Sequence, residues 1–320
     1  MPTTLAQTNK NAIDKQGICP SWPIALFIIL SAASLTIWLA PLLATLALAL
    51  RDDQYTHILL ILPISLTLLF IDSRSPSSKN LNTSARNPPQ YSSRSVKIAT
   101  GLLALALVIS TFVKWRSFPS SFDRQLAIDM FALVLWWIAS FLLCFGSQAF
   151  RRELFPLGFL FWMVPFPNSL LNSIVSLLQY GSAAAAHLLF LIARIPVAQR
   201  GTLVHIPGLT MEVAPECSSI RSSMILLVTS MVLAHLLLRS RWRKITVVAA
   251  AIPLSVVKNG LRIFVLGVLA TRVDPSYLTG RLHRQGGIIF LLIALAMIFL
   301  LIWILRRGDF RRPTAAPGQT

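Results

Sequence analysis

The sequence contains one cysteine whose neighbours favour nucleophilic chemistry. Cys217 follows Glu216, precedes Ser218 and stands four residues before Arg221, where a long apolar run begins. The start of a helix exposes unpaired backbone N–H groups and the positive end of the helix dipole, and both favour a thiolate. Ser218 or Ser219 can cap such a helix, and Arg221 adds a positive charge one turn further on. These features predict that Cys217 is a nucleophile that ionises readily.

The other two cysteines lack this environment. Cys19 lies in a polar N-terminal stretch, and Cys144 stands between Leu143 and Phe145 inside an apolar run, where a cysteine is usually a small packing residue. Three cysteines without paired spacing indicate neither a disulfide framework nor a zinc site. We predict neither a metal ion nor a cofactor.

A second group of candidates lies where polar side chains are costly. Lys258, Asn259 and Arg262 fall inside an apolar stretch, and a charge inside a membrane costs about 2.5–3.5 kcal/mol on insertion scales. Such a residue needs a partner, a water-filled cavity or a function. An arginine that only extends toward the membrane surface or pairs with a neighbouring helix is the plainer alternative for Arg262. We expect these residues to line one pocket outside the cytoplasm together with polar residues of the outer loops. Those loop residues are Asp52, Asp53, His57, His205, Glu212, Glu216, Cys217, Arg221, Arg272, Asp274, Arg281, His283 and Arg284. For the three histidines among them, an ordinary loop position is the plainer alternative.

The composition determines which class of protein must position these residues. Of 320 residues, 55% are hydrophobic and 12% are charged, and the mean hydropathy is +0.69. A water-soluble globular protein of this length cannot bury so much apolar surface, so we predict an all-α, polytopic membrane protein in a lipid bilayer. In a soluble protein the net charge of +18 would suggest nucleic acid. In a membrane protein it indicates topology instead, and we expect no nucleic-acid partner.

Apolar runs of about 20 residues mark the membrane spans. A further run at residues 154–166 has only 13 residues and contains Pro156 and Pro165; at helical rise it would extend about 20 Å, short of the roughly 30 Å membrane core. We predict that it is re-entrant or interfacial. The eight predicted spans are residues 24–46, 57–71, 97–113, 126–146, 169–193, 220–238, 245–270 and 287–305.

Basic residues predict the orientation of these spans. With eight spans and a cytoplasmic N-terminus, most Lys and Arg residues fall in cytoplasmic segments, including the cluster at 239–244 and the C-terminal tail. Counting residues 154–166 as a further full span would move both of these groups outside. We therefore predict a protein of the cytoplasmic (inner) membrane with both termini in the cytoplasm. Residues 1–21 and 306–320 would be tails around a single catalytic membrane domain at 22–305.

A short β-hairpin is predicted just before Cys217. Apolar residues largely alternate with polar ones from Val204 to Val213, and Pro207 and Gly208 interrupt the pattern. Alternation around a Pro-Gly turn is typical of two antiparallel strands. This hairpin would bring Cys217 to the start of the next helix at the outer surface.

Several segments together resemble the exosortase/archaeosortase family of membrane transpeptidases. Three motifs stand in the order found in that family: residues 213–222 (VAPECSSIRS), 259–263 (NGLRI) and 283–287 (HRQGG). Residues 52–57 (DDQYTH) and 161–167 (FWMVPFP) are also similar to recurring segments of the family, and the resemblance covers roughly residues 22–305. The chain departs from the family pattern at Ser219 and Ile58, where the family usually has glycine. Neither change removes a reactive group.

From the expected pocket we take His57, Glu216, Arg221 and Asn259 as supporting or substrate-binding residues. The resemblance implies a catalytic set of Cys217, Arg262 and His283. It also implies the substrates: membrane-anchored exported proteins whose C-terminal sorting signal comprises a short motif such as Pro-Glu-Pro, a transmembrane helix and a basic tail. The enzyme would remove this signal at the outer face through a thioester. Both hydrolysis and transfer to a lipid or glycan acceptor are compatible with that chemistry.

Two other classes of protein remain open from the sequence. A transporter could use Lys258, Asn259 and Arg262 as an anion site, although paired broken helices in corresponding halves are not evident. A membrane glycosyltransferase or a polysaccharide polymerase or export component would use charged residues of the outer loops. Only a cysteine transpeptidase requires Cys217.

Overall fold

The computed structural model of the chain describes residues 22–74, 92–115, 122–213, 220–278 and 281–310. Eight helices of this described part are long and apolar enough to cross a membrane, and each coincides with one predicted span. The prediction of an all-α, polytopic membrane protein is therefore confirmed. The helices divide between two compact units: Met1–Leu48 with Ile58–Phe166 (unit 1), and Ala49–His57 with Pro167–Thr320 (unit 2).

Unit 1 contains most of α2 (Trp22–Arg51), then α3 (Ile58–Arg74), α5 (Ser93–Trp115) and α6 (Phe122–Arg152). Two indole N–H groups of α6 hold α2: Trp136 donates to the carbonyl oxygen of Leu30 and Trp137 to the hydroxyl of Ser34, both at 2.9 Å. α5 and α6 are joined by the buried hydroxyl of Ser110, which donates to Oδ1 of Asp129 at 2.9 Å. These hydrogen bonds satisfy polar groups that would be costly to leave unpaired in an apolar interior.

The short apolar run that follows α6 forms two brief helices. α7 spans Leu154–Phe159 and η2 spans Leu160–Met163; together they make a shorter apolar helix that is not one of the eight. The hydroxyl of Ser65 in α3 donates to the carbonyl oxygen of Pro156 at 2.7 Å and holds this segment inside unit 1. Its short length is as predicted, and its interfacial or re-entrant placement stays a prediction.

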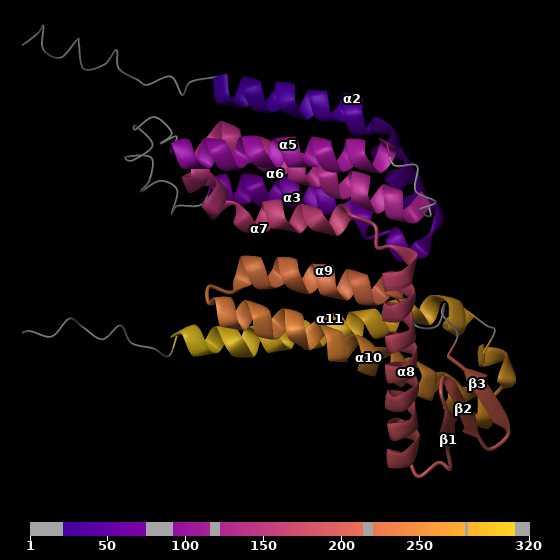
Figure 1. Cartoon of the computed structure of the whole chain (residues 1–320). Helices are drawn as coiled ribbons and strands as arrows, with labels where there is room; N and C mark the ends of the chain where they lie inside the picture. Colours follow the sequence, from indigo (N-terminus) through magenta and orange to yellow (C-terminus); the bar gives the residue numbers. More distant parts are fainter. Residues whose placement is uncertain (1–21, 75–91, 116–121, 214–219, 279–280, 311–320) are drawn as a thin grey trace, which may run out of the picture. The chain divides into compact units, whose positions relative to one another are not determined.

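Unit 2 is built on α8 (Asn168–Ile192), α9 (Ile220–Leu237), α10 (Arg241–Arg272) and α11 (Arg281–Phe310). The last three pack against one another through a shared apolar core that includes Leu226, Val247 and Ile298. In Figure 1, α8 crosses the direction of α9 and α11. It packs closely on α10 because Gly260 leaves room: a Cβ atom there would lie 2.5 Å from Cβ of Ala185.

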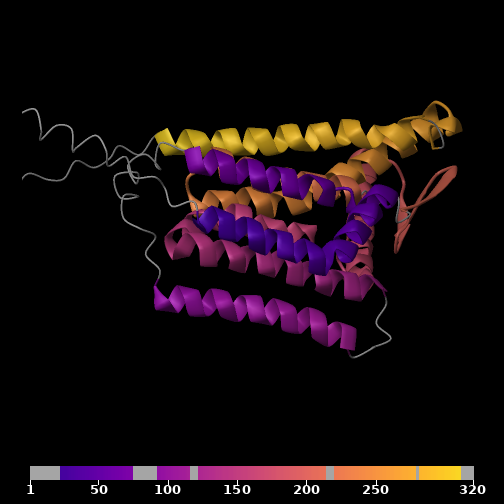
Figure 2. The same cartoon turned by 90° about the horizontal axis from the view of Figure 1, so that it is seen from above.

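A three-stranded antiparallel sheet follows α8, with strands β1 (Ala198–Arg200), β2 (Leu203–Ile206) and β3 (Leu209–Glu212). β2 and β3 form the predicted hairpin, with Ile206 paired to Leu209 around a proline and a glycine whose φ is 81°, as a type II turn requires. β1 was not predicted, because its three residues show no alternation. In both Figure 1 and Figure 2, the sheet lies at the end of unit 2 where α11 begins.

One face of the sheet is buried on α8 and α10. Its apolar side chains form a common core with Ala183, Ala186 and Phe190 of α8 and Ile263 of α10. The chain that leaves β3 toward residues 214–219 is therefore anchored to the two helices.

Candidate functional site

Arg262 lies on α10 and extends toward the start of α11. It is half-buried, and a Cβ atom added at Gly287 would lie 3.9 Å from its Nη1 atom. His283 belongs to the first turn of α11, four residues before Gly287 and so on the same side of that helix. The side chain of His283 is outside the described part of the chain. The structure thus brings the second and third motifs side by side, although 20 residues separate Arg262 from His283 in the sequence.

The two polar residues before Arg262 contact different helices. Lys258 has 5% of its surface exposed, and its Nζ atom donates a hydrogen bond to the hydroxyl of Ser222 in α9. Asn259, 1% exposed, donates from Nδ2 to the hydroxyl of Ser182 in α8 at 3.0 Å. Successive helical residues point about 100° apart, so Lys258 bonds to α9 and its neighbour Asn259 bonds to α8. Asn259 therefore contacts α8, on a different side of α10 from Lys258, and its supporting role stays a prediction.

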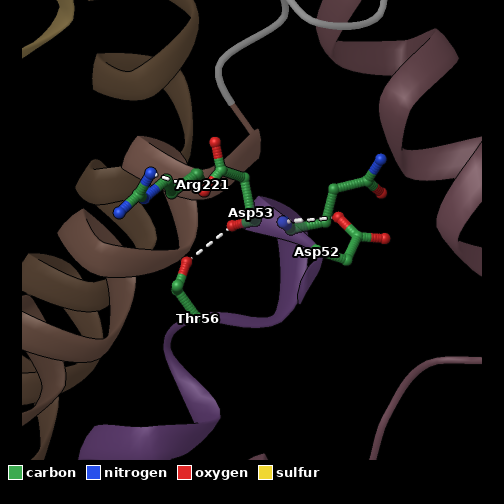
Figure 3. Close-up of polar contacts among 5 residues, drawn as sticks. Asp52, Asp53, Thr56 and Arg221 are labelled. Atoms are coloured by element: carbon green, nitrogen blue, oxygen red, sulfur yellow. Dashed lines mark hydrogen bonds and ion pairs between the residues drawn. The ribbon is translucent and has the colours of Figure 1, made fainter. Parts of the chain in front are cut away.

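Arg221, in the first turn of α9, forms an ion pair with the loop that follows α2. Its Nη1 atom lies 2.6 Å from Oδ1 of Asp53, and both side chains are exposed. Asp53 begins η1 (Asp53–Tyr55), and Figure 3 shows how its neighbours shape this turn. Oδ1 of Asp52 accepts from the backbone N–H of Gln54 at 2.9 Å, and the hydroxyl of Thr56 donates to the carbonyl oxygen of Asp53 at 2.6 Å. These short local bonds are typical of capped turns.

His57, the next residue of this segment, is buried, with 4% of its surface exposed. This burial distinguishes it from a solvated loop histidine, and its role in the site stays a prediction.

Cys217 and Glu216 lie outside the described residues, within the segment 214–219. Both ends of this segment are held by described residues. Val213 donates its backbone N–H to the carbonyl oxygen of Thr202 at 3.0 Å and accepts from Nε2 of Gln179 at 2.8 Å. α9 then begins at Ile220, three residues after Cys217.

Two partners of the site cations were not among the residues given a catalytic or supporting role. Asp53 was predicted only as one of the polar residues that line the pocket, and Ser222 belongs to the first motif without a role of its own. Both act as partners of cations that the sequence did single out, Arg221 and Lys258. The sequence gives no signal for either partner. It does show that Lys258 and Arg262, four residues apart, lie on one face of α10. Within the described part of the chain, no group of three or more His, Cys, Asp or Glu residues could hold a metal ion.

The chain is similar to one family of known proteins. A family model described as "Transmembrane exosortase (Exosortase_EpsH)" matches residues 49–300, which is most of the chain. The chain belongs to the transmembrane exosortase family. No curated protein and no solved structure matches it. The matched region of this exosortase runs from the last turn of α2 into α11, so it includes all three motifs on which the resemblance rested.

Membership of the exosortase family indicates a membrane transpeptidase type of function. It also agrees with the eight apolar helices in describing a multi-pass membrane protein.

Proposed function

We propose that this exosortase is a cysteine protease or transpeptidase that cleaves a C-terminal sorting signal from exported, membrane-anchored proteins. The observation that carries the proposal is that a Cβ atom at Gly287 would lie 3.9 Å from Nη1 of Arg262, since Arg262 belongs to the second motif and Gly287 ends the third, which begins at His283. Family membership supports the same reaction class. The tripartite form of the signal, including a motif such as Pro-Glu-Pro, is part of the proposal.

The proposed mechanism divides the chemistry among three residues. The thiolate of Cys217 attacks the scissile carbonyl carbon, and a thioester forms as the peptide C–N bond breaks. His283 donates a proton to the leaving amine and later accepts one from water or from an acceptor. Arg262 donates hydrogen bonds to the oxyanion that develops on the carbonyl oxygen. Loss of a comparable donor in other enzymes costs about 3–4 kcal/mol of transition-state stabilisation.

The side of the membrane follows from the distribution of positive charge. With the cytoplasmic side assigned to the cluster at 239–244 and to the C-terminal tail, the start of α9 and the start of α11 face outward. A substrate anchored by its own helix in the same bilayer would reach this end directly. The proposed acceptor of the new C-terminus is a surface lipid or glycan, with water as the alternative.

The test uses two cysteine variants of the same protein. Cys217→Ala should abolish processing of a membrane-anchored substrate with such a C-terminal signal. Cys144→Ala is the matched control, because Cys144 is fully buried in α6 of unit 1, and it should leave processing within about twofold of the native rate. Normal processing by correctly inserted Cys217→Ala protein would refute the proposal. Trapping the acyl-enzyme and adding candidate amines then separates transfer from hydrolysis.

A further inference from the structure

We propose that α8 lies along the outer surface of the membrane and that residues 153–167, the crossing segment, cross the membrane in its place. One side of α8 then contacts lipid and another side faces water. This inference goes beyond the proposed function and does not depend on it. It replaces the prediction from the sequence that residues 154–166 are re-entrant or interfacial.

The sheet packs along α8 from the middle of the helix toward its end. Nε2 of Gln179 donates to the carbonyl oxygen of Val213 at 2.8 Å, and a Cβ atom at Gly201, between β1 and β2, would lie 3.7 Å from the ring of Tyr180. Further along α8, Phe190 shares a core with the strands. If α8 crossed the bilayer, its middle would lie near the membrane centre and the sheet would lie in hydrocarbon beside it.

An open sheet is not stable in hydrocarbon. β1 and β3 are the two outer strands of this sheet, and the N–H and C=O groups on the free side of an outer strand need water or protein partners. These strands also carry exposed charged side chains, Arg200 on β1 and Glu212 on β3. The sheet therefore lies outside the membrane core, and the part of α8 from Gln179 to Phe190 lies there with it.

The direction of α8 agrees with this placement. In Figure 1, α8 runs across α9 and α11 of the same unit, so a membrane that α9 and α11 cross has α8 along its surface. The close contacts of α8 with α10 involve Val256, Gly260 and Gly267, all in the second half of α10. That half is the outer one when the basic cluster at 239–244 is cytoplasmic.

The exposed residues of α8 form a polar side and an apolar side. The polar side consists of hydroxyl and amide residues at helical spacing: Ser169, Asn172, Ser173 and Ser176. The apolar side consists of large residues with 47–72% of their surface exposed: Leu170, Leu177 and Leu188. Ser176 and Leu177 are adjacent, so the two sides point about 100° apart. This division is typical of a helix at a membrane surface, whereas a crossing helix would hold its polar side in hydrocarbon at a cost.

The crossing segment runs through unit 1 alongside α3 and α6. It begins where both helices end, because Nη2 of Arg152 donates to a carbonyl oxygen in the last turn of α3. Pro156 lies beside the middle of α3, where its carbonyl oxygen accepts from Ser65 at 2.7 Å. The ring of Phe161 lies 5.4 Å from that of Phe131, which is closer to the start of α6. The segment therefore passes from the end of α3 and α6 toward their start.

The crossing segment is long enough because only its first part is helical. α7 and η2 together extend about 17 Å at their usual rises. The last four residues, which are extended at Val164 and at Pro167, add about 13 Å. The total is close to the roughly 30 Å membrane core; the shorter reach expected from the sequence assumed a helix throughout. Leu157, Phe159 and Met163 are buried, and non-helical backbone is tolerated at membrane depth where protein surrounds it.

The exchange preserves the orientation of the chain. The protein still crosses the membrane eight times, through the crossing segment and the seven apolar helices other than α8. The basic cluster at 239–244 and the C-terminal tail therefore stay cytoplasmic. Residues 153–193 contain no Lys or Arg, so the exchange moves no cation across the membrane.

Cysteine accessibility distinguishes the two arrangements. Single cysteines are introduced into full-length protein that lacks the native ones (Cys19→Ser, Cys144→Ser, Cys217→Ala), and a membrane-impermeant maleimide is added to sealed, right-side-out vesicles. Ser169→Cys and Ser176→Cys should both be labelled without permeabilisation. If α8 crossed the membrane instead, Ser169→Cys would lie on the cytoplasmic side and Ser176→Cys within the hydrocarbon.

Three controls calibrate the labelling. Thr210→Cys, exposed on β3, should be labelled from outside, and Arg151→Cys, exposed at the end of α6, only after permeabilisation. Met297→Cys lies in the middle of α11 with 49% of its surface exposed. It should react at least roughly tenfold more slowly than the two α8 variants, because a thiol in hydrocarbon does not ionise.

Two outcomes would overturn the proposal, in variants whose thermal unfolding matches the parent. One is labelling of Ser169→Cys only after permeabilisation. The other is a rate for Ser176→Cys as low as that of Met297→Cys. Asn172→Cys and Ser173→Cys lie on the same side of α8 and repeat the test if either variant fails to fold. Failure of the proposed function would appear as processing by Cys217→Ala protein, which the labelling does not measure.

Discussion

Replacing Gly260 by alanine tests the closest helix contact near the candidate site. A Cβ atom at Gly260 would lie 2.5 Å from Cβ of Ala185, 3.1 Å from its carbonyl carbon and 3.0 Å from the backbone nitrogen of Ala186. Ordinary contacts between carbon atoms are about 3.5–4.0 Å. None of the three atoms belongs to a flexible side chain, so α8 and α10 would have to separate by about 1 Å.

The expected loss of stability follows from this separation. Overpacking of a well-packed interior costs about 1–3 kcal/mol, and the higher helix propensity of alanine offsets at most about 1 kcal/mol of it. The neighbouring bond from Asn259 to Ser182, 3.0 Å long and buried, would also lengthen. A net loss of about 1–3 kcal/mol corresponds to a fall of roughly 2–10 °C in the unfolding midpoint.

The assay is thermal unfolding in detergent, followed by circular dichroism, for three alanine variants. Gly101→Ala is the matched control, since no atom lies within 4 Å of a Cβ there, and its midpoint should not fall. Gly267→Ala should be intermediate, because its contacts are the ends of the flexible side chains of Met211 and Phe190. If Gly260→Ala protein unfolds at the same temperature as Gly101→Ala protein, the close approach of α8 and α10 is wrong.

Two further predictions concern charged groups. The exposed Asp53–Arg221 pair should contribute only about 0.2–1 kcal/mol to stability, so Asp53→Asn and Arg221→Gln should scarcely change the unfolding midpoint. Both should slow processing, and the double variant should be no slower than either single one; additive losses would show that the two residues act independently. Burial and the nearby carboxylate of Asp72 raise the pKa of Glu153 from 4.5 to about 7, although the positive charge of Arg152 partly offsets them. Between these two pH values the unfolded chain loses a proton that the folded chain keeps, so folding stability falls as pH rises from 4.5 to 7 and levels off above it. Glu153→Gln should remove this decline, and an equal midpoint difference between variant and parent at pH 5 and pH 8 would contradict the assignment.

Much of the fold could be predicted because the governing property is local. A run of apolar residues long enough to cross a membrane is visible in the sequence whatever its neighbours do, and all eight predicted spans coincide with helices. The hairpin of β2 and β3 was visible for the same reason, since alternation and a Pro-Gly turn are both short-range signals. β1 has no such signal. It becomes a strand only by pairing with β2, from Ala198 opposite His205 to Arg200 opposite Leu203.

The sequence singled out the polar residues of α10 but not the residues that they contact. Lys258, Asn259 and Arg262 stood out because polar side chains are costly in an apolar helix. Their partners Ser222 and Ser182 could not be recognised, because serine is common in membrane helices and each lies 36 or more residues away. The buried pair of Ser110 and Asp129 in unit 1 was missed altogether, since a single aspartate at the edge of a span reads as a loop residue.

The sequence by itself determined that this exosortase is a membrane protein, where its apolar helices lie and which residues could carry its chemistry. These properties depend on hydropathy and spacing along one chain. Only the tertiary structure decided that Lys258 bonds to α9, that Asn259 bonds to α8 and that Arg262 lies near Gly287 of α11. Those assignments depend on how closely helices approach, and small residues such as Gly260 and Ala185 set that distance only when two segments distant in sequence meet.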